Sequence, residues 1–242
     1  MKILAIDTTT KFLTLAIYDN GRVCEYNLEV GIKLASLLAP TIKRVLEAAG
    51  LTIGAIDYFA CGLGPGSFTG IRVGLSTIKG FGLALHKPII GVPTLDILAM
   101  NAPMGDKIII PVIDAKRSLI YSCAYKYKKG KLSKVVPYAL ITKEELYKKI
   151  KSPSIVFGDA LILYREDIIR LQSQAPYGGP AVAKRRRVAL GGVSFLDKDC
   201  WYPKAHNIIT LALDKIRQGR ADKNFKINPI YLYPKECQIS RR

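Results

Sequence analysis

The chain contains the stretch Gly62-Leu63-Gly64-Pro65-Gly66-Ser67-Phe68-Thr69-Gly70-Ile71-Arg72-Val73-Gly74-Leu75, which combines a strand end, a glycine-rich loop and a helix start. Five of these fourteen residues are glycine. Pro65 lies between two of them, which predicts a tight turn in which a neighbour has φ > 0. Ser67 and Thr69 are both good N-cap residues. Free N–H groups at a helix start are typical of an anion site, so the loop is predicted to approach either an anion or another segment closely.

Two nucleotide-binding fingerprints can be compared with this loop. A P-loop requires Lys and then Ser or Thr after its last glycine, whereas Gly70 is followed by Ile71 and Arg72. The dinucleotide pattern G-x-G-x-x-G places two residues after its second glycine, and the spacing from Gly64 to Gly70 is too long for it. Neither fingerprint fits. A loop whose glycines serve packing alone is an open alternative.

The helix that follows the loop is predicted to have two contact faces. An apolar face packs inward, while the other face lacks large side chains near the helix start and lets a second helix come close. The preceding helix, predicted over Ile32–Ala49, carries an apolar stripe of its own. We predict that both helices form a partner interface. Its candidate residues are Leu34, Leu38, Ile42, Gly70, Arg72, Gly74, Thr77 and Phe81.

Working outward, the chain repeats one order of elements. The first half has predicted strands at Lys2–Ile6, Leu13–Tyr18, Val23–Glu29, Asp57–Cys61 and Pro88–Gly91, with helices before and after the fourth. The second half has predicted strands at Lys107–Asp114, Ser118–Tyr127, Leu132–Pro137 and Ser154–Gly158, and helices at Thr142–Ile150 and Ala160–Leu171. This predicts two α/β lobes, residues 1–103 and residues 104–242, with the last helix able to pack back on the first lobe.

Several segments resemble one known family. The stretch Gly62–Arg72 resembles the signature of the TsaB (YeaZ) family, whose members take part in making threonylcarbamoyladenosine on tRNA. Further segments resemble landmarks of the same family, namely Met1–Thr10, Gly91–Leu95, Asp114–Arg117 with Tyr121, and Asn228–Leu232. The resemblance covers most of the chain except roughly residues 172–199.

The resemblance implies a partner subunit without a catalytic site of its own. Its first lobe would dock on a TsaD-type catalytic subunit, which transfers threonylcarbamoyl to adenosine in tRNA, with a TsaE-type ATPase as a further partner. For the chain alone, a homodimer and a monomer are both open alternatives. No cofactor is required by the chain itself, and ATP or ADP is expected at most at the interface of the complex.

An aspartate follows the first strand of each predicted lobe. Asp7 precedes Thr8 and Thr9, and Asp114 precedes Ala115 and Lys116. Paired lobes of this kind resemble the actin, sugar-kinase and Hsp70 superfamily, which holds ATP between two ribonuclease-H-like lobes. That resemblance makes a set of residues candidates for nucleotide or phosphate binding, namely Asp7, Thr8, Thr9, Gly64, Gly66, Ser67 and Asp114. The alternative is that both aspartates cap turns.

Charge is distributed unevenly. The chain has a net charge of +18, of which residues 1–114 contribute +1 (10 basic against 9 acidic residues) and residues 115–242 contribute +17 (27 against 10). Lysine and arginine runs of this kind are typical of phosphate contacts and also of solvated loops. Arg185, Arg186 and Arg187 are the candidate tRNA contacts, and binding is predicted to be directed to the RNA backbone.

Composition argues against several classes. Five cysteines lack a C-x-x-C pair, and the two histidines, His86 and His206, lie far apart, so we predict neither a disulfide framework nor a metal site. A TsaD-type subunit has a His-x-x-x-His pair that this chain lacks. No membrane span or signal peptide is apparent, which predicts a cytoplasmic protein. The rival functions are an ATP-dependent small-molecule kinase of the same superfamily and, more weakly, a metallopeptidase.

Overall fold

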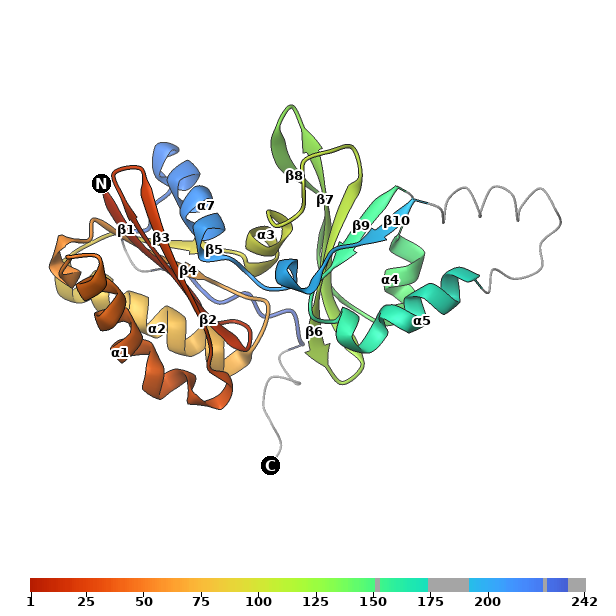
Figure 1. Ribbon diagram of the computed structural model, residues 1–242, viewed down its shortest axis with the longest axis horizontal. Helices are drawn as coiled ribbons and strands as arrows, with labels where there is room; N and C mark the ends of the chain where they lie inside the picture. The colour runs from red at the N-terminus through yellow and green to blue at the C-terminus, as the bar shows by residue number, and fades with distance from the viewer. Residues whose placement is uncertain (151–152, 174–191, 224–225, 235–242) are drawn as a thin grey trace. The chain divides into compact units, whose positions relative to one another are not determined.

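The computed structural model describes residues 1–150, 153–173, 192–223 and 226–234 (Figure 1). These residues form two compact units. The first lobe comprises Met1–Ile97 and Pro203–Tyr231, and the second comprises Leu98–Tyr202 and the chain from Leu232 on. The boundary predicted from the sequence is 103/104. The structure places it at 97/98 and assigns the segment Pro203–Tyr231, which contains the last described helix, to the first lobe.

The first lobe has a five-stranded sheet with helices on both faces. The strand order is β3-β2-β1-β4-β5, antiparallel among β1 to β3 and parallel among β1, β4 and β5. The strands are β1 (Lys2–Asp7), β2 (Phe12–Asp19), β3 (Arg22–Glu29), β4 (Tyr58–Gly62) and β5 (Ile89–Val92). The helices are α1 (Leu34–Ala48), α2 (Phe68–Leu85), α3 (Thr94–Ala99), which crosses the 97/98 boundary, and α7 (Ala205–Arg217).

Alternation along β1 explains why both faces of this sheet are covered. Leu4 and Ile6 point into a core that contains buried residues of α1 and α2. Ile3 and Ala5 point into a second core with buried residues of α7. All four residues are fully buried, so this central strand is hydrophobic on both sides. In Figure 1, α1 and α2 lie on one side of the sheet and α7 lies on the other.

The second lobe repeats the strand order of the first. Its sheet runs β8-β7-β6-β9-β10, antiparallel among β6 to β8 and parallel among β6, β9 and β10. The strands are β6 (Ile108–Lys116), β7 (Leu119–Lys128), β8 (Lys131–Ile141), β9 (Ser154–Phe157) and β10 (Val193–Phe195). The helices are α4 (Lys143–Lys149) and α5 (Leu161–Ser173). The predicted class, two tandem ribonuclease-H-like α/β lobes, is confirmed.

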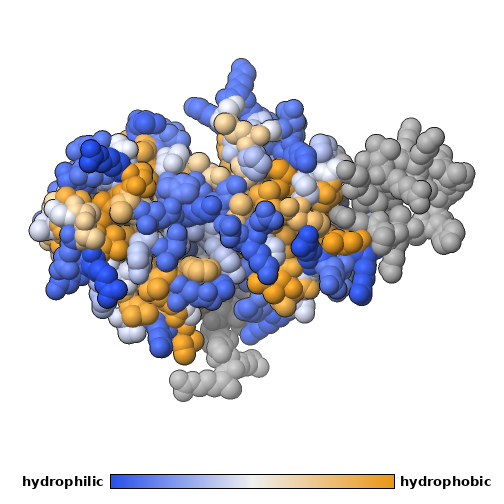
Figure 2. Space-filling view, in the orientation of Figure 1, coloured by the Kyte–Doolittle hydropathy of each residue, from blue (hydrophilic) through white to orange (hydrophobic). Residues whose placement is uncertain are grey.

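Local signals account for several element boundaries. Ser67 is the N-cap of α2, and its hydroxyl accepts a hydrogen bond from the Gly70 N–H at 3.2 Å. Thr69, the other predicted cap, lies inside the helix. Gly64, beside Pro65, has φ of +90°, as predicted. Within the described residues, no helix is long and apolar enough to cross a membrane. Hydrophilic and hydrophobic residues both reach the visible surface (Figure 2).

Candidate functional site

The glycine-rich loop packs directly on the backbone that follows β1. A Cβ atom at Gly66 would lie 2.4 Å from the Thr9 carbonyl oxygen, and one at Gly70 would lie 2.0 Å from the Thr8 carbonyl oxygen. Both separations are far below van der Waals contact, so only glycine allows this approach. The Ser67 N–H donates to the Thr9 carbonyl at 2.7 Å and fastens the loop there. The glycines therefore serve packing inside the first lobe, the alternative that the sequence left open.

Asp7 lies in a closed environment at the end of β1. Its side chain is 1% exposed, and its Oδ1 accepts hydrogen bonds from the Thr9 N–H at 2.9 Å and the Thr9 hydroxyl at 2.8 Å. Its Oδ2 accepts a longer bond of 3.3 Å from the Thr94 hydroxyl. Burial raises the pKa of this carboxyl, although the hydrogen bonds from Thr9 and Thr94 oppose the shift. Asp7 therefore caps a turn, as the structural alternative predicted.

Three backbone donors near Asp7 are already in use. The Gly64 N–H donates to the Thr94 hydroxyl at 3.1 Å, the Gly70 N–H to the Ser67 hydroxyl, and the Ser67 N–H to Thr9. A phosphate would require several free N–H groups at one place. Nucleotide binding by Asp7, Thr8, Thr9, Gly64, Gly66 and Ser67 remains a prediction, and these hydrogen bonds do not favour it.

Asp7→Asn tests the cost of the buried carboxylate. Because the pKa of Asp7 is raised in the folded state, its contribution to stability is present below the unfolded value of 3.8 and is lost as pH rises through the folded pKa. Asparagine keeps an acceptor for Thr9 and carries no charge. We expect the variant to be more stable than the parent by about 1–3 kcal/mol at pH 7 and by less near pH 4. Urea unfolding at both pH values measures this, and a less stable variant at pH 7 would contradict it.

The structure corrects much of the predicted interface. Leu34, Leu38 and Ile42 are 7%, 2% and 2% exposed and pack in the core beneath α1 and α2. Gly70 and Gly74 are also buried, and a Cβ at Gly74 would lie 2.2 Å from the Thr8 hydroxyl. These residues do not face a partner. The face of α2 with small side chains, which was predicted to contact a second helix, packs against Thr8 instead.

The remaining predicted interface residues are partly accessible. Phe81 is half-buried against Phe59, with ring centroids 5.6 Å apart. Thr77 is half-buried, and its hydroxyl donates to the Val73 carbonyl at 2.9 Å. Arg72 is exposed.

A different stripe of α2 faces solvent. Arg72, Ser76, Gly80 and Ala84 recur every four residues and are all exposed, and Leu83 beside them is 55% exposed. A Cβ at Gly80 would meet no atom within 4 Å. We call these five residues the docking face. They form a helix surface with small side chains at its centre. This surface lies on a different side of α2 from the predicted interface.

Arg72 belongs to an ordered aromatic cluster at the start of this face. Its guanidinium lies 3.9 Å from the ring centroid of Phe68, and its Nε donates to the Tyr231 hydroxyl at 3.2 Å. The two rings are 5.0 Å apart. Exposed, pre-arranged arginine and aromatic side chains are the residue types that dominate binding energy at protein interfaces. Sequence spacing indicated Arg72 but missed Tyr231, which is 159 residues away.

In the second lobe, Asp114 pairs with a carboxylate that the sequence analysis did not select. The Asp114 N–H donates to Asp159 Oδ1 at 2.9 Å, and Asp114 Oδ1 accepts from the Lys116 N–H at 2.9 Å. Asp114 therefore also caps a turn. Burial, with a smaller contribution from the Asp114 charge, raises the pKa of Asp159 to about 6. The sequence signal that could have identified Asp159 is its position directly after Gly158, at the end of β9.

The β6–β7 turn has an unusual backbone. Lys116, Arg117 and Ser118 all have positive φ, at 64°, 50° and 58°. Residues other than glycine adopt this region at an energetic cost. The Tyr233 hydroxyl lies 2.9 Å from the Ala115 carbonyl oxygen and 3.2 Å from the Lys116 carbonyl oxygen, and it donates to them. The Tyr233 side chain therefore holds the β6–β7 turn in place.

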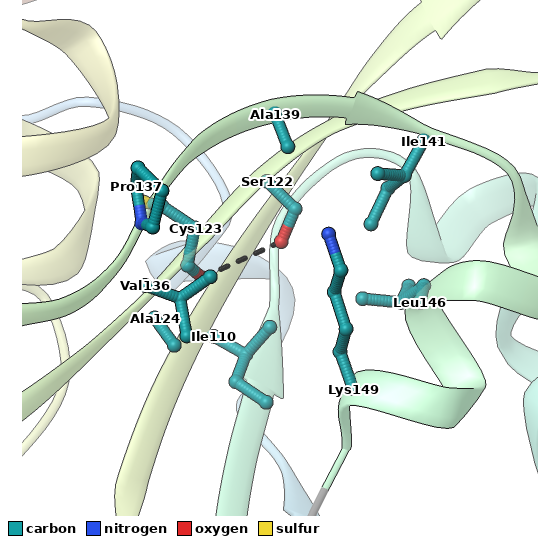
Figure 3. Close-up of a pocket in the computed structure, with 10 residues that line it drawn as sticks. All are labelled: Ile110, Ser122, Cys123, Ala124, Val136, Pro137, Ala139, Ile141, Leu146 and Lys149. Atoms are coloured by element: carbon teal, nitrogen blue, oxygen red, sulfur yellow. Dashed lines mark hydrogen bonds between the residues drawn. The ribbon is translucent and has the colours of Figure 1, made fainter.

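A small hollow lies between β6, β7, β8 and α4 (Figure 3). Its lining is mostly apolar, with the Ser122 hydroxyl on one side and the Lys149 side chain extending across it. The Ser122 hydroxyl donates to the Pro111 carbonyl at 3.0 Å. The cavity volume is about 20 Å³, which is room for about one water molecule. A nucleotide does not fit in this hollow.

Two further predictions concern metal and tRNA. Across the described ranges, no three His, Cys, Asp or Glu side chains gather into a group that could hold a metal ion. Arg185, Arg186 and Arg187, the candidate tRNA contacts, lie outside the described residues.

Comparison with known proteins shows what the chain resembles. The family model described as TsaD: tRNA N6-adenosine threonylcarbamoyltransferase matches residues 31–179. The tRNA threonylcarbamoyladenosine biosynthesis protein TsaB of Bacillus subtilis is 28% identical over 226 residues, 92% of this chain and 96% of that protein. The TsaB protein of Buchnera aphidicola is 34% identical, over 65% of this chain and 78% of that protein. The solved structure of YeaZ from Pseudomonas aeruginosa is 25% identical and has a TM-score of 0.75, covering 96% of this chain and 99% of that one.

Proposed function

Because this chain belongs to the TsaB family, we propose that it is the non-catalytic subunit of a complex that transfers threonylcarbamoyl to adenosine in tRNA. Its partner in this proposal is a TsaD-type catalytic subunit, and a TsaE-type ATPase joins the complex. The observation that carries the proposal is the docking face of α2, which is exposed and has small side chains at its centre.

The docking face suits a close helix-to-helix contact. Ser76, Gly80 and Ala84 lie on one line along the helix, so a partner helix can approach the α2 backbone. Arg72 at one end and Leu83 at the other supply a charged aromatic anchor and an exposed apolar side chain. Isolated chains could use the same face to form a homodimer.

The proposal assigns no catalytic or cofactor role to the chain alone. Asp7 is buried and hydrogen-bonded within its own lobe, and the Gly64 and Gly70 N–H groups donate to side chains of that lobe. ATP or ADP belongs in this proposal to the assembled complex. A kinase function would require Asp7 to reach a bound metal and phosphate, which its closed surroundings do not favour.

Gly80→Leu tests the docking face without harming the fold. Leucine is a better helix former than glycine, although by less than the gap of about 0.8–1.0 kcal/mol that separates alanine from glycine, and the space around Gly80 is open, so the lobe remains folded. The added side chain holds a partner helix away. We expect affinity for the TsaD-type subunit to fall at least tenfold, as measured by calorimetry, and modification of tRNA by the reconstituted complex to fall with it.

Gly54→Leu is the matched control. Gly54 is exposed with no atom near its Cβ position, and it lies outside α1 and α2. We expect this variant to bind the partner as the parent does. Normal binding by Gly80→Leu, or an equal loss in Gly54→Leu, would contradict the proposed docking face. Sedimentation of each variant alone reports whether a homodimer uses the same surface.

A further inference from the structure

The end of the β7–β8 hairpin extends beyond the rest of its sheet. Ile109 and Tyr125 form the outermost pair of β6 with β7, whereas β7 and β8 go on pairing to Lys128 and Lys131. Residues 126–133 therefore pair only with one another, and Lys134 pairs with Tyr125; we call residues 126–134 the tip. In Figure 1, β7 and β8 run toward the top of the view, and the top of the space-filling view is hydrophilic (Figure 2).

The tip concentrates positive charge. Residues 115–143 contain eight Lys and Arg residues and no Asp or Glu, and five of the eight are lysines of the tip. Lys128, Lys129 and Lys131 are exposed, and Lys126 is half-exposed. In the described part of the chain, none of these four lysines has an acidic side chain within ion-pair distance. Their charges face solvent unneutralised.

This arrangement lowers the stability of the hairpin. Lys128 and Lys131 are a directly opposed cross-strand pair, and like charges at such positions are destabilising. Lys129 occupies a turn position with φ of 49°, where asparagine, aspartate or glycine is favoured.

The same chain contains a turn without these costs. The β2–β3 hairpin turns through Asp19-Asn20-Gly21-Arg22, which places opposite charges across the strands and asparagine at φ of 46°. A lysine-rich turn is therefore not needed to close a hairpin of this kind.

We propose that the tip of the β7–β8 hairpin binds the phosphate backbone of RNA. Unneutralised lysines release counterions from phosphates, and this drives binding that does not depend on base sequence. The choice of RNA over other polyanions rests on the proposed function.

Aromatic rings of the hairpin are not free to stack on bases. The Lys134 ammonium lies 3.3 Å from the ring centroid of Tyr138, Tyr125 is buried, and Tyr127 is half-buried. Recognition at the tip is therefore electrostatic and indifferent to base identity.

The rival explanation is protection of a sheet edge. β8 is the edge strand, and lysines on edge strands prevent pairing with other chains. That role requires charge of either sign, whereas phosphate binding requires positive charge. A variant whose tip stays charged but has fewer positive and more negative side chains separates the two explanations.

The experiment transfers the turn of the first lobe to the tip. Lys128→Asp, Lys129→Asn and Lys131→Arg together reproduce the Asp-Asn-Gly-Arg turn and change the net charge by −3. We expect the affinity of the full chain for an unmodified tRNA transcript in filter binding to fall at least tenfold at low salt. The salt slope should flatten by about 1.5, since two lysines are removed and each phosphate contact contributes about 0.7–0.9. The thermal midpoint should stay the same or rise.

Lys223→Asp with Lys226→Asn is the control. Both residues are exposed, and the pair changes the net charge by the same −3. Normal binding by this control supports the proposal. An equal loss in the control, or unchanged affinity and slope in the tip variant, would overturn it. Loss of binding to anionic vesicles with tRNA binding intact would assign the tip to a membrane surface and also overturn it. The tip variant should bind the TsaD-type subunit as the parent does. A failure of the tip proposal can therefore be distinguished from a failure of the proposed function.

Discussion

Gly70→Ala should unfold the first lobe under conditions in which Gly80→Ala stabilises it. The added methyl group at position 70 would lie 2.0 Å from the Thr8 carbonyl oxygen and 3.1 Å from its carbonyl carbon. Relief requires α2 to move away from β1, which breaks the 2.7 Å bond from the Thr8 hydroxyl to the Gly70 carbonyl. We expect a loss of more than about 4 kcal/mol, beyond the usual range for one substitution.

Gly80→Ala makes the same chemical change on the same helix. Its Cβ meets open space, and alanine is the better helix former by about 0.8–1.0 kcal/mol. Urea unfolding of both variants measures the difference directly. Similar midpoints for the two variants would mean that the packing of α2 on Thr8 is not as tight as the structure has it.

Gly158→Ala should have a comparable effect on the second lobe. Gly158 follows β9, has φ of +129°, and a Cβ there would lie 2.0 Å from the Val112 carbonyl oxygen. Both the backbone conformation and the contact exclude a side chain, because moving the neighbour means displacing the central strand β6. We expect a loss of about 4 kcal/mol or more, seen as lost hydrogen-exchange protection in β6 and β9.

Gly130→Ala separates the cost of a left-handed backbone from the cost of a steric clash. Gly130 also has a left-handed backbone, with φ of +74°, but no atom lies within 4 Å of its Cβ position. The free energy of unfolding of this variant should fall by only about 1–2 kcal/mol, which is the cost of placing alanine in a left-handed backbone conformation. If Gly158→Ala lost no more than this, the contact with Val112 would be irrelevant to stability.

The docking face shows the limit of helix periodicity. The spacing of Gly70, Gly74, Thr77 and Phe81 indicated a face of α2 with a distinct role. Periodicity reports that residues share a face but not which face is covered. Thr8, 62 residues before Gly70, lies against that face, so the solvent-facing stripe is the one through Ser76 and Gly80.

Contacts between residues far apart in the sequence also place α7 in the first lobe. α7 is far from the first lobe in sequence, yet its buried residues pack on Ala5, Ala16 and Ala60. Glu25 accepts a hydrogen bond of 2.6 Å from the Ala205 N–H, at the start of α7. The sequence predicted that the last helix can pack back on the first lobe, and these contacts confirm it. Only the structure shows which face of the sheet α7 covers, because nothing local to α7 identifies that face.

Sequence by itself determined the order of most elements and the tight turn at Gly64, and it offered Ser67 as one of two caps and turn-capping as one of two roles for Asp7 and Asp114, because each depends on neighbours within a few residues. Only the tertiary structure decided that the glycines of the loop pack on Thr8 and Thr9 and that Asp159 lies beside Asp114. Those relations join segments on different strands, and side chains come together there only after the sheet has formed.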